Sequence, residues 1–170
     1  MDLKRYIRTV PDFPMAGIQF RDITTLLKDK DAYHELIDRM VGLLEGKVID
    51  LVIGPEARGF VLGAAVAYAL CAGFIVARKP GKLPAKTTRY SYGLEYGTDV
   101  LEVHEDAIKP GQKVAFVDDL LATGGTALAT IKLAEQSGGE IVAVRFAIEL
   151  AAMNGREAIK SYDVKSVMEF

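Results

Sequence analysis

Four short apolar runs, separated by segments with helical periodicity, most constrain how this 170-residue chain can fold. The runs are nearly free of polar residues, as expected of strands that are covered on both faces. Segments 31–45 and 124–137 carry apolar residues at helical spacing, and Gly138-Gly139 after the second is a typical helix stop. Because strands and helices alternate, we expect an α/β fold with a central parallel sheet flanked by helices. The four runs are residues 48–53, 74–77, 113–117 and 141–148.

The longest uncharged stretch, residues 59–77, approaches the roughly 20 residues that a transmembrane helix needs. It is rich in Ala, and Ala72-Gly73 has the character of a helix end followed by a β-type run. We therefore expect a buried helix that leads into a buried strand. The charged start of the chain is unlike a signal peptide, and the single Cys71 excludes a disulfide framework. These features favour a cytoplasmic protein.

No linker or internal repeat divides the sequence, so we expect one domain over residues 1–170. Apolar residues from Leu3 to Val10 at helical spacing predict a short N-terminal helix. Segments 90–96 and 100–103 read as the two strands of an inserted hairpin, with Gly97-Thr98 as its turn. Ligands of open α/β sheets bind beyond the carboxyl ends of the strands, and we expect the site in the loops there.

The charges nearly cancel in total but not along the chain. There are 21 basic and 23 acidic residues, a net charge of −2, which argues against a general nucleic-acid binder. Residues 78–90 hold five basic side chains and no acid, whereas residues 91–106 hold five acids and no Lys or Arg. The basic segment suits a highly anionic small substrate.

The strongest local signal is the segment 114–126, an apolar strand followed by two acids and a loop of small residues that enters a helix. Gly124 and Gly125 let the backbone approach an anion closely, and the helix start with the Thr123 and Thr126 hydroxyls suits a phosphate monoester. The pattern is neither a Walker A loop nor a dinucleotide fingerprint. Asp118 and Asp119 would repel phosphate but can accept hydrogen bonds from vicinal ribose hydroxyls. The alternative is that these acids only end a strand and that Thr123 only caps a helix.

This segment resembles the phosphoribosyl-pyrophosphate (PRPP) binding signature of the type I phosphoribosyltransferases. Other segments are similar to those of the adenine-specific members of that family: 13–23 to their base-recognition segment, 54–60 to their pyrophosphate loop, and 78–84 with 92–97 to their mobile loop and hairpin. The resemblance covers essentially the whole chain. It implies the type I phosphoribosyltransferase fold, with residues 1–30 contributing a small hood over the base, and the conversion of adenine and PRPP to AMP and pyrophosphate.

The resemblance also implies roles for individual residues. Glu95, Arg58 and Lys79 would be catalytic, with Glu95 hydrogen-bonding N7 of adenine or moving its proton. Arg58, Lys79 and Lys82 would bind pyrophosphate, and Asp118 and Asp119 the ribose. The phosphate-binding residues would be Ala122, Thr123, Gly124, Gly125 and Thr126, and the adenine-binding residues Ile18, Gln19, Phe20, Arg21 and Leu150.

The family resemblance further implies a homodimer and a Mg²⁺ ion that arrives on PRPP, without a dedicated protein metal site. Gln19 stands where relatives often carry an apolar residue, so a contact from its side chain could relax the choice of base. Two rival functions stay open at this point. One is a purine phosphoribosyltransferase for a 6-oxopurine such as xanthine, and the other is a PRPP-sensing regulator that binds DNA without catalysis. A basic recognition helix for DNA is absent from the sequence before the first core strand.

Overall fold

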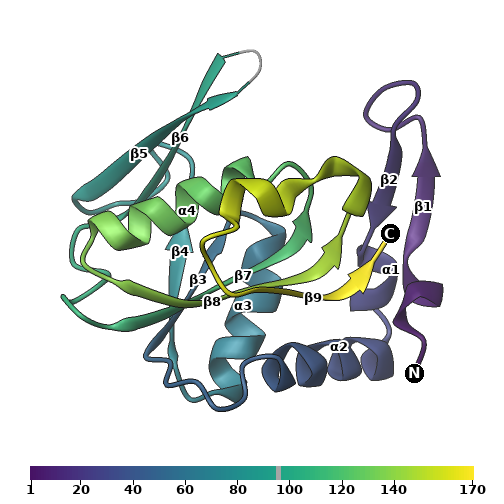
Figure 1. Ribbon diagram of the computed structural model, residues 1–170, viewed down its shortest axis with the longest axis horizontal. Helices are drawn as coiled ribbons and strands as arrows, with labels where there is room; N and C mark the ends of the chain where they lie inside the picture. Colours follow the sequence, from purple (N-terminus) through teal and green to yellow (C-terminus); the bar gives the residue numbers. More distant parts are fainter. Residues whose placement is uncertain (95–96) are drawn as a thin grey trace.

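The computed structural model describes residues 1–94 and 97–170, and a five-stranded parallel sheet forms its centre (Figure 1). Helices lie on both faces of this sheet, so the expected α/β architecture is confirmed. The strands are, in spatial order, β4 (Gly73–Ala77), β3 (Leu51–Pro55), β7 (Lys113–Leu121), β8 (Glu140–Glu149) and β9 (Val164–Glu169).

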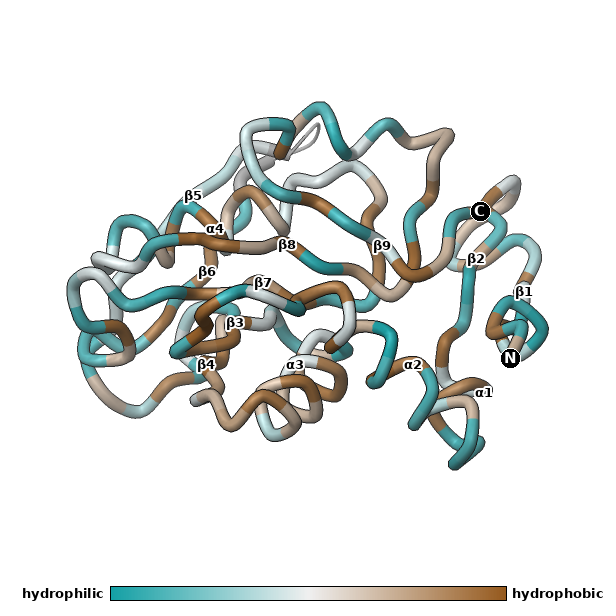
Figure 2. Tube along the Cα trace, turned by 60° about the horizontal axis from the view of Figure 1, so that its bottom comes forward, coloured by the Kyte–Doolittle hydropathy of each residue, from teal (hydrophilic) through white to brown (hydrophobic). Residues whose placement is uncertain are grey.

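The sheet separates two hydrophobic cores. Helices α2 (Lys30–Gly42) and α3 (Arg58–Ala69) pack on one face, and α4 (Gly125–Gln136) packs on the other. Along β3, Val52 joins the first core and Ile53 the second, because successive side chains of a strand point to opposite faces. This burial on both faces explains why the strands read as continuous apolar runs. Figure 2 shows α3 coloured as apolar along most of its length, whereas α2 alternates between apolar and polar residues.

The uncharged stretch 59–77 forms most of α3 and the whole of β4, as the buried helix and strand interpretation predicts. Helix α3 is 12 residues long. In the part of the chain that the structure describes, no helix is both long and apolar enough to span a membrane.

Two antiparallel hairpins lie at opposite ends of the sheet (Figure 1). The first pairs β1 (Arg8–Pro11) with β2 (Gln19–Asp22), and the second pairs β5 (Thr87–Leu94) with β6 (Gly97–His104). The remaining short elements are the 3₁₀ turns η1 (Leu3–Tyr6), η2 (Ala151–Met153) and η3 (Gly155–Ile159), and the helix α1 (Thr24–Leu27).

Two predictions for the first half of the chain are wrong in their bounds. The N-terminal helix ends at Tyr6 instead of continuing to Val10, because Val10 pairs with Phe20 in the β1–β2 hairpin. The strand predicted from residue 48 begins at Leu51, and Val48 is 74% exposed before it.

Two predictions for the second half also need correction. Gly97-Thr98 does not form the hairpin turn, because Gly97 pairs with Leu94 and Thr98 with Gly93 inside the hairpin. The strand predicted to end at Val117 continues through both acids to Leu121, where it still pairs with Glu149 of β8. The longer strand β7 therefore carries Asp118 and Asp119 within it.

The order of the strands identifies where a ligand is expected. From β3 the chain moves outward to β4, and it then returns to place β7 on the other side of β3, followed by β8 and β9. The direction of winding therefore reverses between β3 and β7. In open α/β sheets, ligands bind at such a switch point, beyond the carboxyl ends of the strands.

Candidate active site

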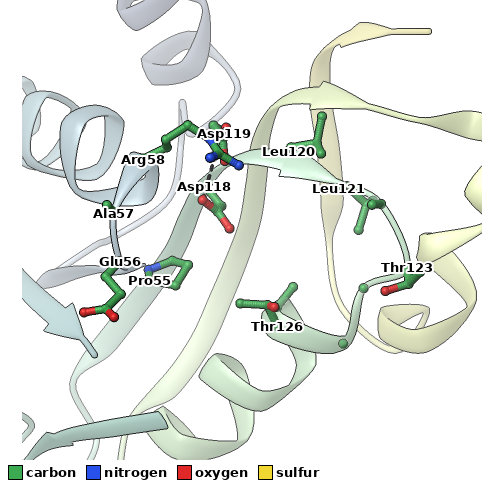
Figure 3. Close-up of a pocket in the computed structure, with 14 residues that line it drawn as sticks. Pro55, Glu56, Ala57, Arg58, Asp118, Asp119, Leu120, Leu121, Thr123 and Thr126 are labelled. Atoms are coloured by element: carbon green, nitrogen blue, oxygen red, sulfur yellow. Dashed lines mark hydrogen bonds and ion pairs between the residues drawn. The ribbon is translucent and has the colours of Figure 1, made fainter. Parts of the chain in front are cut away.

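A pocket of about 260 Å³ lies at the carboxyl ends of β3 and β7, at this switch point (Figure 3). Two segments that are distant in the sequence line it, residues 55–58 from the end of β3 to the start of α3 and residues 118–127 from β7 to the start of α4. The first joins β3 to α3 and the second contains the acids and the small-residue loop. The structure therefore brings together the two segments that the sequence analysis assigned to pyrophosphate and phosphate.

The loop Ala122–Gly124 leads directly into α4 and presents backbone N–H groups. Gly124 has a φ of 83°, a left-handed conformation that glycine adopts without strain. Leu128 donates the first helical hydrogen bond, to the carbonyl of Gly124 at 2.9 Å. Within the described residues, the N–H groups of the first helical turn before Leu128 have no partner. These N–H groups and the positive end of the helix dipole suit an anion, as the sequence analysis predicts.

The two adjacent acids of β7 face different surroundings, since neighbouring strand residues point to opposite sides. Asp119 is buried and forms an ion pair with Arg58. The carboxylate of Asp118 points into the pocket (Figure 3), and its Oδ1 accepts a hydrogen bond from the Asp119 N–H at 2.8 Å. Burial, with the negative charge of Asp119, raises the pKa of Asp118 well above its ordinary value.

Arg58 begins α3 and connects the pocket to the N-terminal hairpin. Its guanidinium pairs with Asp119 and lies 5.8 Å from the centre of the Phe20 ring. Burial opposes the charge of Arg58, but the hydrogen bond to Asp119 and the negative charges of Asp119, Asp118 and Asp22 together raise its pKa above the ordinary value. Arg58 therefore stays a cation beside the pocket. Its guanidinium also lies near Phe20, the residue predicted to stack on the base.

The other two predicted pyrophosphate ligands follow β4 and pair with acids of the chain. Lys79 forms an ion pair with Asp99 of β6, whose carboxylate also accepts a hydrogen bond from the Tyr92 hydroxyl at 3.0 Å. Lys82 Nζ lies 2.6 Å from Glu56 Oε1. Neither lysine lines the pocket, although Glu56 does.

Glu56 is a residue that the sequence analysis did not single out. Its side chain points away from the pocket centre (Figure 3) and also accepts from Arg78 Nε at 2.8 Å. Burial opposes ionisation of Glu56, but the hydrogen bonds from Lys82 and Arg78 hold its pKa below the ordinary value. The available signal was its place two residues before Arg58, within the segment 54–60 that the resemblance assigns to pyrophosphate.

Two of the predicted adenine-binding residues, Phe20 and Arg21, have different neighbours, because successive side chains of β2 point to opposite faces. Phe20 packs edge-on against Phe13 with ring centres 5.1 Å apart, on the side of Arg58. Arg21 instead bonds to the Thr9 hydroxyl and lies 4.6 Å from the centre of the Phe170 ring. Ile18 and Gln19 are exposed at the start of the strand. The N–H of Leu150 donates to the carbonyl of Leu121, a residue that lines the pocket, at 2.9 Å.

The predicted catalytic Glu95 lies outside the described residues. The strand before it, β5, runs beside the start of α4, since a Cβ added to Gly125 would lie 4.0 Å from the ring of Tyr92. The β5–β6 hairpin thus adjoins the start of α4 through Tyr92.

Comparisons with known proteins agree with this geometry. Residues 23–169 match the phosphoribosyl transferase domain. The chain is 57% identical to the adenine phosphoribosyltransferase of Alkaliphilus metalliredigens over 170 residues, which is the full length of both proteins. It belongs to the adenine phosphoribosyltransferase family.

Solved structures of this family have the same fold. The crystal structure of adenine phosphoribosyltransferase from Thermoanaerobacter pseudethanolicus matches with a TM-score of 0.97 at 51% identity, covering 99% of this chain and 98% of that one. The Saccharomyces cerevisiae enzyme, complexed with adenine and an imino-altritol bisphosphate, matches with a TM-score of 0.91 at 35% identity, covering 98% and 96%. The central sheet with its flanking helices is therefore the type I phosphoribosyltransferase fold.

Proposed function

We propose that this protein transfers 5-phosphoribose from PRPP to N9 of adenine, giving AMP and pyrophosphate in purine salvage. The observation that carries the proposal is one pocket at the β3–β7 switch point, which combines an anion-binding loop, two acids and Arg58. A phosphorylated sugar that also carries pyrophosphate needs all three: the loop for its phosphate, the acids for its hydroxyls and the cation for its pyrophosphate. Membership of the adenine phosphoribosyltransferase family supports adenine as the acceptor.

In this proposal the loop Ala122–Thr126 binds the 5-phosphate, through the free N–H groups at the start of α4 and the hydroxyls of Thr123 and Thr126. Asp118 and Asp119 accept hydrogen bonds from the ribose hydroxyls. Asp119 can do so while paired with Arg58, because a carboxylate has about four acceptor positions. The ribose then lies between the loop and the residues that follow β3.

Bond changes occur at C1 of the ribose. The bond from C1 to the pyrophosphate oxygen breaks as the bond from C1 to N9 of adenine forms, and the electron pair leaves with pyrophosphate. Arg58, Lys79 and Lys82 stabilise the charge that develops on this leaving group. Because Lys79 and Lys82 are paired with Asp99 and Glu56, they exchange these partners for pyrophosphate when it is bound.

The acceptor base stacks on Phe20 in the proposal, with Leu150 opposite and the backbone of Ile18-Gln19 reading its edge. Glu95 holds or accepts the proton that the ring loses when N9 bonds to C1. Arg21 contributes by orienting the strand that carries Phe20, since its own side chain is turned toward Thr9 and Phe170.

Mg²⁺ belongs to the proposal as an ion carried by PRPP. The donor set fits this arrangement. Of the three acids that line the pocket, Asp119 is paired with Arg58, and Glu56 is paired with Arg78 and Lys82. Asp118 and the phosphates of PRPP are left to face the ion. No group of three or more metal-binding side chains is present among the described residues. When bound, the ion would neutralise charge on the pyrophosphate group. A homodimer is proposed from the family resemblance, and a cytoplasmic location from the single cysteine.

The test is turnover of adenine with PRPP and Mg²⁺, followed by AMP detection, beside a panel of hypoxanthine, guanine and xanthine. We expect AMP formation to exceed product formation from each other base by at least about 100-fold, since a hydrogen-bonded base site rejects poorly matched bases strongly. A rate with adenine no better than with a 6-oxopurine would overturn the choice of base. DNA retention in a filter-binding assay, without turnover, would instead favour the regulator.

A further inference from the structure

The loop Ala122–Gly124, which we call the phosphate loop, contacts a glycine from a distant segment. A Cβ added to Gly155, in η3, would lie 2.1 Å from the carbonyl oxygen of Ala122. A Cβ added to Gly124 would lie 2.5 Å from the carbonyl oxygen of Gly155. The two backbones are therefore in direct contact, and no side chain fits between them. The position of Gly155 therefore limits how far the backbone of the loop can move away from the pocket.

The residue after Gly155 is fixed by a buried carboxylate. Arg156 donates to both oxygens of Glu149, from Nε to Oε1 at 2.5 Å and from Nη2 to Oε2 at 2.7 Å. Ser166 Oγ donates to the same Oε2 at 2.7 Å, and Arg156 Nη1 donates to the carbonyl of Val164 at 2.9 Å. One guanidinium thus joins η3 to both β8 and β9. We call Arg156, Glu149 and Ser166 the Arg156 cluster.

The Arg156 cluster is also in register with the strand that enters the loop. Glu149 pairs with Leu121, the last residue of β7 before Ala122. The side chain of Glu149 is only 8% exposed, and the hydrogen bonds from Arg156, with that from Ser166, keep its pKa below the ordinary value despite burial. A bidentate bond to a buried carboxylate is directional as well as strong. It therefore fixes both the distance and the orientation of η3 relative to β7.

The loop has little else to hold its shape. In residues 1–94 and 97–170, no hydrogen bond joins Ala122 or Thr123 to another residue. The first turn of α4 likewise keeps its N–H groups free toward the pocket. Backbone N–H groups bind an anion more tightly when they already point toward its site, because the free energy needed to order them otherwise lowers the affinity. Among the described residues, the backbone of Gly155 makes the closest approach to the loop, and Ala158 and Tyr92 lie farther from it.

We propose that Arg156 is a positioning residue for phosphate binding: through its bidentate bond to Glu149 it holds Gly155 against Ala122 and so fixes the phosphate loop. This inference rests on the proposed function, because it assigns the loop to the 5-phosphate of PRPP and AMP. It predicts a larger effect on phosphorylated ligands than on adenine, since Phe20, on which the base is proposed to stack, lies outside the Arg156 cluster.

The test uses Arg156→Gln, with Arg156→Lys as a milder variant that keeps the charge but loses the bidentate geometry. We measure the KM for PRPP and for adenine, kcat, and the Kd for AMP by calorimetry. Arg156→Gln is expected to raise the KM for PRPP and the Kd for AMP about tenfold. The KM for adenine should stay within about twofold and kcat within about threefold. Arg156→Lys should give an intermediate effect with the same selectivity.

Two comparisons separate positioning from a general loss of stability. Arg39→Gln removes a more exposed Arg–Glu ion pair, that of Arg39 with Glu35 on α2 at 2.6 Å, and should leave the KM for PRPP unchanged. The double variant Arg156→Gln with Glu149→Gln should weaken AMP binding no more than Arg156→Gln alone, because both act through one contact.

The inference is overturned if Arg156→Gln and Arg156→Lys raise both KM values equally, or if they lower Tm while AMP binds as in the wild type. Should Arg156→Gln not fold, Arg156→Lys and Ser166→Ala give the same readouts, with Ser166→Ala expected to weaken AMP binding about twofold to threefold. A wild-type protein that forms no AMP would mean that the proposed function fails. Wild-type turnover with unaffected variants would mean that only this inference fails.

Discussion

Arg58 and Asp119 form an ion pair that joins the start of α3 to β7 along one wall of the pocket. The two residues are unequal in exposure: the side chain of Asp119 is 8% exposed and that of Arg58 is 49% exposed. The acid is thus fixed within the sheet, while the guanidinium keeps a face toward the pocket. One cation can therefore compensate a buried carboxylate and still meet an anionic ligand.

Arg58→Gln is expected to lower kcat by about 100-fold or more, because the developing charge on pyrophosphate loses its nearest cation. It also leaves the buried Asp119 without its charged partner, so Tm should fall. Arg58→Lys keeps a positive charge, so its kcat and its Tm should both fall less than those of Arg58→Gln. Steady-state kinetics and thermal unfolding of the two variants check this, and a kcat for Arg58→Gln within threefold of the wild type would contradict it.

Gly59→Ala is expected to raise the KM for PRPP several-fold. A Cβ at this position would lie 2.9 Å from Asp118 Oδ1 and 2.8 Å from Pro55 Cδ, so it displaces the carboxylate assigned to the ribose. Gly42→Ala is the matched control, since a Cβ there meets nothing within 4 Å, and it should be neutral or slightly stabilising. Equal KM values for the two variants would show that the space beside Asp118 is unimportant.

Glu95→Gln is expected to lower kcat by about 100-fold or more while the KM for PRPP stays near that of the wild type, since general-base assistance contributes factors of this size. Glu105→Gln, an exposed acid after β6, serves as the control and should retain full turnover. Unchanged kcat in Glu95→Gln would remove this residue from the mechanism.

Asp22 makes the stability of the N-terminal hairpin depend on pH. Hydrogen bonds from Thr24 and Arg8 lower its pKa from 3.8 to about 2. A lowered carboxyl pKa stabilises the folded state above pH 3.8, and this stabilisation is lost as the pH falls through 2.

Asp22→Asn should therefore lower the free energy of unfolding at pH 7 by about 1 to 2 kcal/mol, and by less at pH 2. Urea unfolding at both pH values measures this, with the exposed Asp38→Asn as a control. A destabilisation that is as large at pH 2 as at pH 7 would rule out the ion pair as its origin.

Phe170 connects the last strand to the N-terminal hairpin. Its ring centre lies 4.6 Å from the Arg21 guanidinium and 5.2 Å from Lys4 Nζ. Phe170→Leu keeps an apolar side chain but removes the π face, and it should lower the free energy of unfolding by about 1 kcal/mol. A double-mutant cycle with Arg21→Gln should give a coupling of about 0.5 to 1 kcal/mol. Strict additivity would mean that the ring contributes only by packing.

Local features of the sequence were sufficient for much of the fold. Apolar runs 74–77, 113–117 and 141–148 all lie in strands, because burial on both faces of a sheet leaves a continuous apolar pattern. Helical spacing identified α2 and α4 nearly to their ends. The small-residue loop before α4 was also evident, since glycine at a helix start has a local backbone cause.

Where pairing between strands decides the conformation, local patterns were insufficient. Residues Leu3 to Val10 have helical spacing, yet Val10 lies in β1 because Phe20 of β2 pairs with it. Likewise, β7 continues through two acids because β8 supplies hydrogen-bond partners as far as Glu149. In both places the partner strand is distant in the sequence, so a window of neighbouring residues carries no sign of it.

The sequence by itself determined which chemical groups this protein has: a small-residue loop before a helix, two adjacent acids, Arg58 after one strand and a basic segment after the next. Only the tertiary structure decided which of them meet. Arg58 and Asp119 pair across 61 positions because β3 and β7 are neighbours at the switch point, and Gly155 lies against Ala122 while the next residue, Arg156, bonds to Glu149. Such contacts depend on the order of strands in the sheet, a property of the whole chain that is not written at any one position.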